Sequence, residues 1–234
     1  MQQELNEKQV LDYILKYFEL LDKNFDSKNK KKLPFKDLKN IMDDMNVLFN
    51  KFYDLNPEKC SKLSTMRYIP LLNLVVKLDK DGTRAIEYMK YLKNAYRMSA
   101  RTSLESYFIY REWELEPSDL ERIFAPRYNI LVGYVHYLEE IVTNPNLRLI
   151  IANLPSGYGK TYTEKVSEAW AFGRDPTGTV LSMCSNERVA TGGSETVRVE
   201  MKKEWFGEVF PELAWNKEKK DYFLKEKNNE WKLK

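Results

Sequence analysis

Apolar residues in the first half of the chain recur at steps of three and four, the spacing of one face of an α-helix. The first run covers Val10, Leu11, Ile14, Leu15, Phe18 and Leu21. A second run extends over residues 35–55, after a polar linker at residues 22–33, and Asn56-Pro57 is expected to stop it. We interpret these apolar faces as the core of a helical region, although they could also dock a partner helix.

The same helical spacing returns at residues 83–98, 102–115 and 130–142. The pattern then changes, because residues 147–153 (LRLIIAN) and 179–185 (TVLSMCS) are short apolar runs typical of buried strands. Residues 162–172 between them have helical spacing. A strand–loop–helix–strand order predicts parallel strands with helices packed against them, so we expect an α/β fold from Leu147 onward.

The turn between the first expected strand and its helix, residues 154–161, reads LPSGYGKT. Gly157 and Gly159 can adopt positive φ angles and bring backbone N–H groups close to phosphate oxygens. Lys160 can reach the β- and γ-phosphates, and Thr161 can offer a hydroxyl to Mg²⁺. The turn therefore predicts a site for ATP and Mg²⁺. The full phosphate-loop pattern has a glycine where this chain has Leu154, so the motif is the shorter Ser-Gly-x-Gly-Lys-Thr form.

Composition adds few constraints. The 234 residues carry a net charge of only +3, which does not by itself indicate a nucleic-acid binder. The two cysteines, Cys60 and Cys184, show no disulfide or metal spacing, which suits a reducing compartment. With His136 as the one histidine, histidine-based zinc and triad chemistry are excluded. No apolar run is long enough for a transmembrane helix, so we expect no membrane association.

An ordered series of short segments resembles the large terminase subunit of tailed bacteriophages. After the glycine turn come residues 169–176 (AWAFGRDP), 180–185 (VLSMCS), 187–190 (ERVA), 197–198 (VR) and 208–213 (EVFPEL). Before the turn, residues 100–107 (ARTSLESY) and 124–127 (FAPR) also match. The resemblance spans residues 100–213, and it is the order and spacing of the pieces that make it specific.

The resemblance implies a DNA-packaging motor. Its ASCE-type ATPase domain drives double-stranded DNA through the portal protein into a procapsid, and a small terminase subunit selects the DNA. A separate nuclease domain uses divalent metal. We therefore expect a helical N-terminal leader at residues 1–99, followed by a partial P-loop ATPase sheet with flanking helices at residues 100–234. The expected location is the host bacterial cytoplasm, at the procapsid portal, with homo-oligomers forming on the portal.

By motif match, Lys160 would be the catalytic Walker A lysine and Thr161 the magnesium-side hydroxyl. Residues Ser156, Gly157, Tyr158, Gly159, Lys160 and Thr161 would together form the nucleotide-binding loop. Many family members carry an arginine four residues before the lysine, where this chain has Ser156. A transition-state arginine would then have to come from elsewhere. The candidates are Arg127, Arg148, Arg174, Arg188 and Arg198.

A second departure is that no apolar strand ending in an acidic pair follows the loop. Hydrolysis by this class requires such a pair to hold Mg²⁺ and activate water. Asp43-Asp44 is the only adjacent aspartate pair, and it falls in an amphipathic helix before the loop. We therefore expect a truncated front part of the ATPase domain that binds nucleotide weakly and hydrolyses it poorly.

Two other interpretations stay open. A superfamily 2 helicase-like ATPase fragment would have a similar glycine-lysine-threonine turn, but a different segment after the second strand. The chain could also be a non-catalytic nucleotide-binding module whose helical leader binds a partner.

Overall fold

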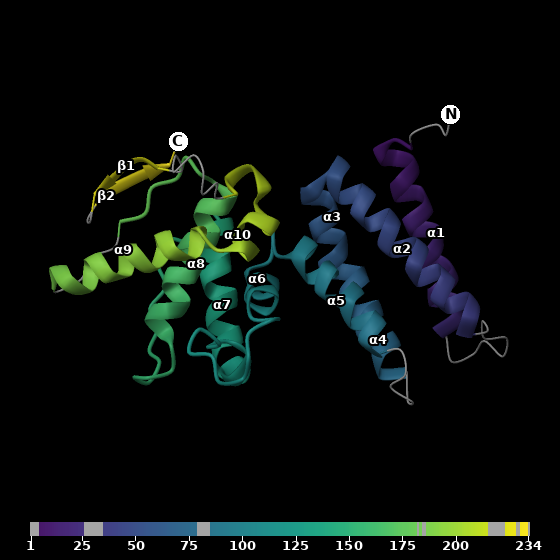
Figure 1. The fold of residues 1–234 in the computed structure, drawn as a ribbon, viewed down its shortest axis with the longest axis horizontal. Helices are drawn as coiled ribbons and strands as arrows, with labels where there is room; N and C mark the ends of the chain where they lie inside the picture. Colours follow the sequence, from purple (N-terminus) through teal and green to yellow (C-terminus); the bar gives the residue numbers. More distant parts are fainter. Residues whose placement is uncertain are drawn as a thin grey trace. The chain divides into compact units, whose positions relative to one another are not determined.

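A computed structural model describes residues 5–25, 35–78, 85–181, 183, 186–214, 223–227 and 230–233. These residues form α-helices joined by turns, with one antiparallel hairpin, β1 (Phe223–Lys227) and β2 (Glu230–Leu233), near the C-terminus (Figure 1). The chain divides into two compact units, Met1–Leu92 and Lys93–Lys234. No helix in the described ranges is both long and apolar enough to cross a bilayer.

The first unit contains α1 (Glu7–Phe25), α2 (Phe35–Leu55), α3 (Pro57–Leu63), the π-helical turn η1 (Ser64–Tyr68), α4 (Ile69–Leu78) and the start of α5 (Ala85–Ser99). The helices expected from apolar spacing are present as α1 and α2. Their buried faces meet at Phe49, whose ring packs edge-on against Phe18 at 6.1 Å and stacks on Tyr68 at 4.1 Å between centroids.

Two local sequence signals explain how α2 gives way to the next helices. Asn56 ends α2 and caps α3, because its side-chain oxygen accepts a hydrogen bond from the backbone N–H of Lys59 at 3.1 Å. Pro70 lies just inside α4, where its missing N–H and its ring disturb the preceding turn. The chain accommodates Pro70 with the wider π turn of η1 immediately before it.

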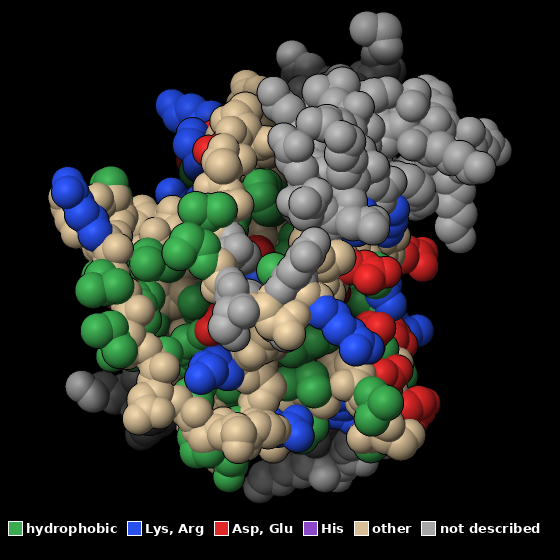
Figure 2. All heavy atoms as spheres, turned by 90° about the vertical axis from the view of Figure 1, so that its left-hand side faces the viewer, with side chains coloured by type: hydrophobic (Ala, Val, Ile, Leu, Met, Phe, Trp, Pro, Cys, Tyr) green, Lys and Arg blue, Asp and Glu red, His purple; other side chains and the backbone are tan. Residues whose placement is uncertain are grey.

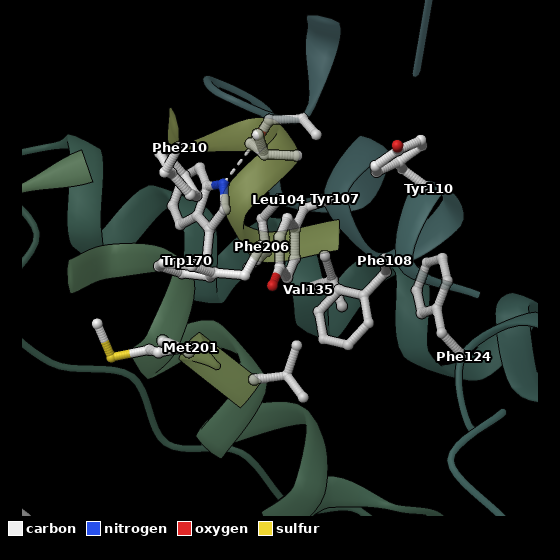
Figure 3. Packing of buried hydrophobic residues seen from close by; sticks show 14 of the residues in the cluster. Leu104, Tyr107, Phe108, Tyr110, Phe124, Val135, Trp170, Met201, Phe206 and Phe210 are labelled. Atoms are coloured by element: carbon white, nitrogen blue, oxygen red, sulfur yellow. Dashed lines mark hydrogen bonds between the residues drawn. The ribbon is translucent and has the colours of Figure 1, made fainter. Parts of the chain in front are cut away.

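The second unit contains α6 (Leu104–Arg111), the short turn η2 (Ala125–Arg127), α7 (Tyr128–Thr143), α8 (Lys160–Arg174), α9 (Glu187–Met201), α10 (Glu204–Val209), the turn η3 (Pro211–Leu213) and the hairpin. Helix α8 packs against both α7 and α9. Side chains from α6 to α10 build one aromatic-rich core, which includes Tyr107, Phe108 and Phe210 (Figure 3).

Trp170 lies at the middle of this core and is fully buried. Its indole N–H donates to the carbonyl oxygen of Ala100 at 2.8 Å, so the polar atom of the ring is satisfied (Figure 3). This bond joins α8 to the turn that follows α5. The core therefore fixes the position of α8, the helix that follows the glycine turn.

The expected α/β fold, with a partial P-loop ATPase sheet from Leu147 onward, is wrong. Residues 147–153 are extended but belong to no sheet, and none of residues 148–158 shares a backbone hydrogen bond with another described residue. The described part of 179–185, which excludes Ser182, Cys184 and Ser185, likewise forms no strand. An extended segment becomes a strand only when a neighbour pairs its N–H and C=O groups, and the described residues of the two segments do not pair with each other.

In the first of these segments, side chains alternate between buried and exposed positions as in a strand, although no strand in the described part of the chain pairs with it. Ala152 and Leu154 pack against the core, whereas Leu149 and Ile151 are 70% and 87% exposed. In the second segment, Leu181 and Met183 are 81% and 82% exposed. Figure 2 shows hydrophobic side chains at the surface on the side of the molecule that lies to the left in Figure 1.

Candidate nucleotide-binding site

The glycine turn has the two left-handed glycines and the following helix that its sequence predicts. Gly157 and Gly159 both adopt left-handed conformations, with φ of 81° and 83°. Gly159 is the residue before α8, and Lys160 is the first residue of that helix. An L-residue rarely takes such φ values, so both glycines are needed for the turn. The predicted positive φ angles and the predicted helix after the loop are therefore confirmed.

The start of α8 provides an electrostatic environment suited to an anion. The first N–H groups of a helix have no partner within it, and the aligned peptide dipoles make this end positive. The helix runs for 15 residues, and no side chain caps its first turn. An anion placed at the loop would therefore meet unpaired N–H groups together with the ammonium group of Lys160.

The residues predicted to contact nucleotide lie on this turn in the expected order. Ser156, Gly157, Tyr158 and Thr161 are exposed, and Lys160 is partly exposed. No atom lies within 4 Å of the position that a Cβ would occupy on Gly157, so the backbone there is open on its outer side. The loop is thus accessible to a ligand, with Lys160 and Thr161 adjacent at its end.

A pocket of about 260 Å³ lies beside Lys160. It is lined by Tyr134, Leu138, Ile141, Ile150, Ala152, Lys160 and Glu164. The Tyr134 hydroxyl donates to Glu164 at 2.5 Å, and burial together with this carboxylate raises the pKa of Tyr134. Most of the wall is apolar, and the extended segment before the loop forms one side of it.

The inner side of the loop rests on the segment between α6 and α7. A Cβ on Gly159 would come within 2.4 Å of Ile123 Cγ2, so the Ile123 side chain occupies the space that any other residue at position 159 would need. Glycine is thus required at position 159 for two reasons, its φ angle and this close contact. Ile123 was not anticipated from the sequence.

A buried ion pair lies under the same region. The Arg111 guanidinium, with no exposed side-chain surface, donates through Nε to both oxygens of Glu200 at 3.0 and 3.1 Å. It also donates to the backbone oxygen of Glu121 at 2.9 Å and to the hydroxyl of Tyr162, in the first turn of α8. Burial raises the pKa of Tyr162 to about 12, so this hydroxyl keeps its proton at neutral pH.

Glu112, the neighbour of Arg111, is equally buried. One oxygen of its carboxylate accepts hydrogen bonds from the N–H groups of Ile123 and Phe124 at 2.9 and 2.7 Å. The other oxygen accepts from the N–H of Ala125 at 2.8 Å. Arg111 and Glu112 were also not anticipated. The available signal was an adjacent pair of opposite charges at the end of an otherwise aromatic helix (residues 107–113, YFIYREW).

The arginines suggested for the transition state occupy other positions. Arg174 lies over the ring of Trp170 at 5.1 Å and donates to the backbone oxygen of Thr102. Arg127 donates to the backbone oxygen of Ile123 at 3.5 Å. Arg148 and Arg188 are exposed, and Arg198 is largely buried. No contact in the described ranges brings one of them to Lys160.

The Asp43-Asp44 pair lies on α2, in the unit that does not contain the loop. Asp44 accepts a hydrogen bond from the hydroxyl of Tyr17 at 2.8 Å, and Asp43 accepts one from Tyr91 at 2.5 Å. Both carboxylates thus bind tyrosines of neighbouring helices. Within the residues that the structure covers, no group of three His, Cys, Asp or Glu side chains is arranged to hold a metal ion.

Comparison with protein families, with curated proteins and with solved structures finds no match to this chain.

Proposed function

We propose that this chain binds ATP with Mg²⁺ through residues 154–161, as the nucleotide-binding portion of a DNA-packaging motor of the terminase large-subunit type. The observation that carries the proposal is the turn itself. Two left-handed glycines precede a lysine at the first position of a helix. The order of short segments that resembles terminases supplies the choice of motor, and the sequence LPSGYGKT supplies the choice of nucleotide.

The physical basis is the positive electrostatic potential at the loop. Unpaired N–H groups of the turn and of the first turn of α8 would donate to phosphate oxygens. Lys160 would place its ammonium group on the β- and γ-phosphates, and Thr161 would offer its hydroxyl to the magnesium ion that bridges them. These roles require adjacent residues that a ligand can reach, and Lys160 and Thr161 are adjacent, the first partly exposed and the second exposed.

Hydrolysis is expected to be slow in the purified chain. Holding Mg²⁺ and activating water require carboxylates near the γ-phosphate, and the only adjacent aspartates, Asp43 and Asp44, bind tyrosines in the other unit. The proposed partners are double-stranded DNA, the portal protein and the small terminase subunit. In their presence the nucleotide state of the loop would control movement of DNA at the portal.

The proposal is tested by isothermal titration of the purified chain with MgADP and with a magnesium complex of a non-hydrolysable ATP analogue. Lys160→Ala should weaken binding of both by at least about tenfold, because a hydrogen bond between charged groups contributes about 1.5–3 kcal/mol. The matched control is Lys90→Ala, which removes an exposed lysine from α5 in the other unit and should leave the affinity unchanged.

Equal affinity for nucleotide in the wild type and in Lys160→Ala would contradict the proposal. The choice of motor is tested separately, by measuring ATP turnover with and without purified portal protein. Stimulation by portal protein supports the terminase assignment, whereas unwinding of a forked DNA duplex by the chain alone would favour the helicase-like alternative.

A further inference from the structure

We propose that Glu112 is a positioning residue for the phosphate loop, acting through Ile123. This inference rests on the proposed function, because it assigns to the nucleotide site a support that no sequence motif indicates. Glu112 itself does not lie on the loop and would not touch a nucleotide. Its carboxylate is instead one end of a chain of contacts that leads to Gly159, the residue immediately before Lys160.

The first step in this chain is the hydrogen bonding of Glu112. Its two carboxylate oxygens accept from the backbone N–H groups of Ile123, Phe124 and Ala125, at 2.7 to 2.9 Å. These N–H groups belong to an irregular connection between α6 and α7, where regular secondary structure does not satisfy them. The N–H of Ile123 also donates to the backbone oxygen of Glu121 at 3.1 Å. Because a buried N–H without a partner is costly, the bonds from Phe124 and Ala125 in particular let the carboxylate fix the path of the connection.

Helix α6 holds Glu112 itself in place. Glu112 is the residue after Arg111, the last residue of that helix, and its own N–H donates to the backbone oxygen of Phe108 at 3.1 Å. Its side chain is almost completely buried. Arg111 reaches the same connection from the other direction, through the backbone oxygen of Glu121. Two consecutive residues thus hold the part of the connection from Glu121 to Ala125.

The second step is the contact between the connection and the loop. The backbone bonds place Ile123 so that its Cγ2 lies against the Cα of Gly159, in the space that a Cβ would otherwise fill. Gly159 must keep its φ near 83° for Lys160 to begin α8 and for the first N–H groups of the helix to face the ligand. The Ile123 side chain, packed against Gly159, restricts the other backbone conformations that this glycine could adopt.

The third step is the far side of the loop, where Arg111 donates to the hydroxyl of Tyr162. Tyr162 is two residues beyond Lys160, so the lysine lies between one contact made by Ile123 and another made by Arg111. Rigid placement of binding groups before the ligand arrives reduces the entropy lost on binding. Arg111 and Glu112 would therefore favour nucleotide binding without contacting the nucleotide.

The test uses Glu112→Gln, which keeps the shape of the side chain. Glutamine offers one oxygen and one NH₂ group, and the NH₂ group cannot accept a hydrogen bond from the connection. The control is Glu114→Gln, which removes the same charge two residues away from a side chain that is 74% exposed and paired with Lys93. A second variant, Ile123→Ala, shortens the contact with Gly159 and leaves Glu112 intact.

We expect Glu112→Gln and Ile123→Ala each to raise the dissociation constant for MgADP by about tenfold in folded protein, with less than additive loss in the double variant. Glu114→Gln should bind as the wild type does. Hydrogen–deuterium exchange without nucleotide gives a second readout. The amide of Thr163, bonded to the Gly159 oxygen at 2.9 Å, should exchange faster in Glu112→Gln, whereas amides around Trp170 should not.

Faster exchange throughout α8 would overturn the proposal, because it would show that Glu112 stabilises the whole core and not the loop. Unchanged exchange at Thr163 would also overturn it, because Glu112 would then have no effect on the start of α8. Should Glu112→Gln fail to fold, Ile123→Ala carries the same comparison. If the wild type binds no MgADP and Lys160→Ala behaves identically, the proposed function fails. The exchange measurement then still decides whether Glu112 orders the loop.

Discussion

Arg111 is a charged side chain whose burial is compensated by the groups around it. Burial lowers the pKa of its guanidinium, but the charge of Glu200, the nearby Tyr162 and Tyr107 and the hydrogen bond to Glu200 together outweigh that effect, and the net pKa is raised. The rings of Tyr162 and Trp205 lie 5.2 and 5.3 Å from the guanidinium carbon, which adds cation–π attraction. Arg111 therefore stays protonated and joins α6, α8 and α9.

Replacing Glu200 should be far more damaging than an exposed charge change. Glu200→Gln removes the carboxylate nearest to the buried Arg111 and leaves it only the more distant carboxylates of Glu121 and Glu112, at 3.4 and 3.7 Å. It also weakens the bonds from Tyr107 and Trp205, which both donate to the Glu200 carboxylate at 2.8 Å. We expect a loss of about 3–5 kcal/mol in the free energy of unfolding. Urea unfolding followed by circular dichroism measures it.

Glu195→Gln is the control for this change, because Glu195 lies on the same helix and is exposed. It should alter the free energy of unfolding by less than about 0.5 kcal/mol. Similar values for Glu195→Gln and Glu200→Gln would show that the Arg111 ion pair does not stabilise the second unit.

The residues of the glycine turn could be found from the sequence, whereas those behind it could not. Gly157, Gly159 and Lys160 are adjacent in the chain, and each has a local physical reason for its identity. Arg111 and Glu200 are 89 positions apart. Nothing in the spacing of either residue indicates the other, because their contact depends on how α6 and α9 pack.

Helix α8 connects the candidate site to the core through two glycines with different roles. Gly159 precedes the helix and needs its left-handed φ. Gly173 lies in the last turn and needs its lack of a side chain, because a Cβ there would come within 2.4 Å of the Phe210 ring. The close approach lets Phe210, the residue after α10, cover the end of α8.

Gly173→Ala should therefore destabilise the protein although alanine favours helices. Inserting a methyl group against the fully buried Phe210 ring overpacks the core, at a cost of about 1–3 kcal/mol. The control is Gly133→Ala in α7, where nothing lies within 4 Å of the new Cβ. That change should stabilise the protein by about 0.5–1 kcal/mol.

Thermal unfolding of both glycine variants measures the contrast. A gain in stability for Gly173→Ala would mean that the Phe210 ring can move away from α8 without cost, so that the close contact at Gly173 does not limit the packing. The opposite signs expected for the two substitutions make the comparison independent of the general preference of helices for alanine.

Helices were easier to predict than strands in this chain for a physical reason. The hydrogen bonds of a helix are local, so the apolar spacing of residues 10–21 is enough to indicate α1. A strand needs a partner that the local sequence does not specify. Residues 147–153 have the composition of a strand and even its alternating burial, but they have no paired neighbour in the described part of the chain.

The two units have separate aromatic cores. In Met1–Leu92, Phe49 is fully buried between Phe18 and Tyr68. In Lys93–Lys234, the core surrounds Trp170. The glycine turn and every residue that supports it, including Glu112, Ile123 and Glu200, lie in the second unit. A change that destabilises the first unit should thus leave nucleotide binding at the loop unaffected.

Phe49→Ala tests this separation. Loss of a buried phenylalanine side chain should cost about 3–5 kcal/mol of stability in the first unit. Its affinity for MgADP should remain that of the wild type, because no support of the loop is changed. Circular dichroism and titration calorimetry on the same sample measure the two quantities. Phe108→Ala, in the second core, is the comparison and should reduce both.

If Phe49→Ala lost nucleotide affinity while Phe108→Ala retained it, the separation of the two units would be disproved. The helical character of residues 1–99 was evident from the sequence, whereas the sheet predicted from Leu147 onward was wrong. The division near Leu92 was not evident, because it falls inside the continuous helix α5, where composition does not change.

Trp170 also gives the second unit an internal spectroscopic reporter. Its indole is sealed from water and hydrogen-bonded to a backbone carbonyl, so its emission should lie toward the blue and resist quenching by iodide. Trp205, which lies against Arg111, is only partly buried and should respond more readily to added quencher. Because Trp170 is on the helix that begins at Lys160, a change in its lifetime when a ligand is added would show that an event at the loop reaches the centre of the core.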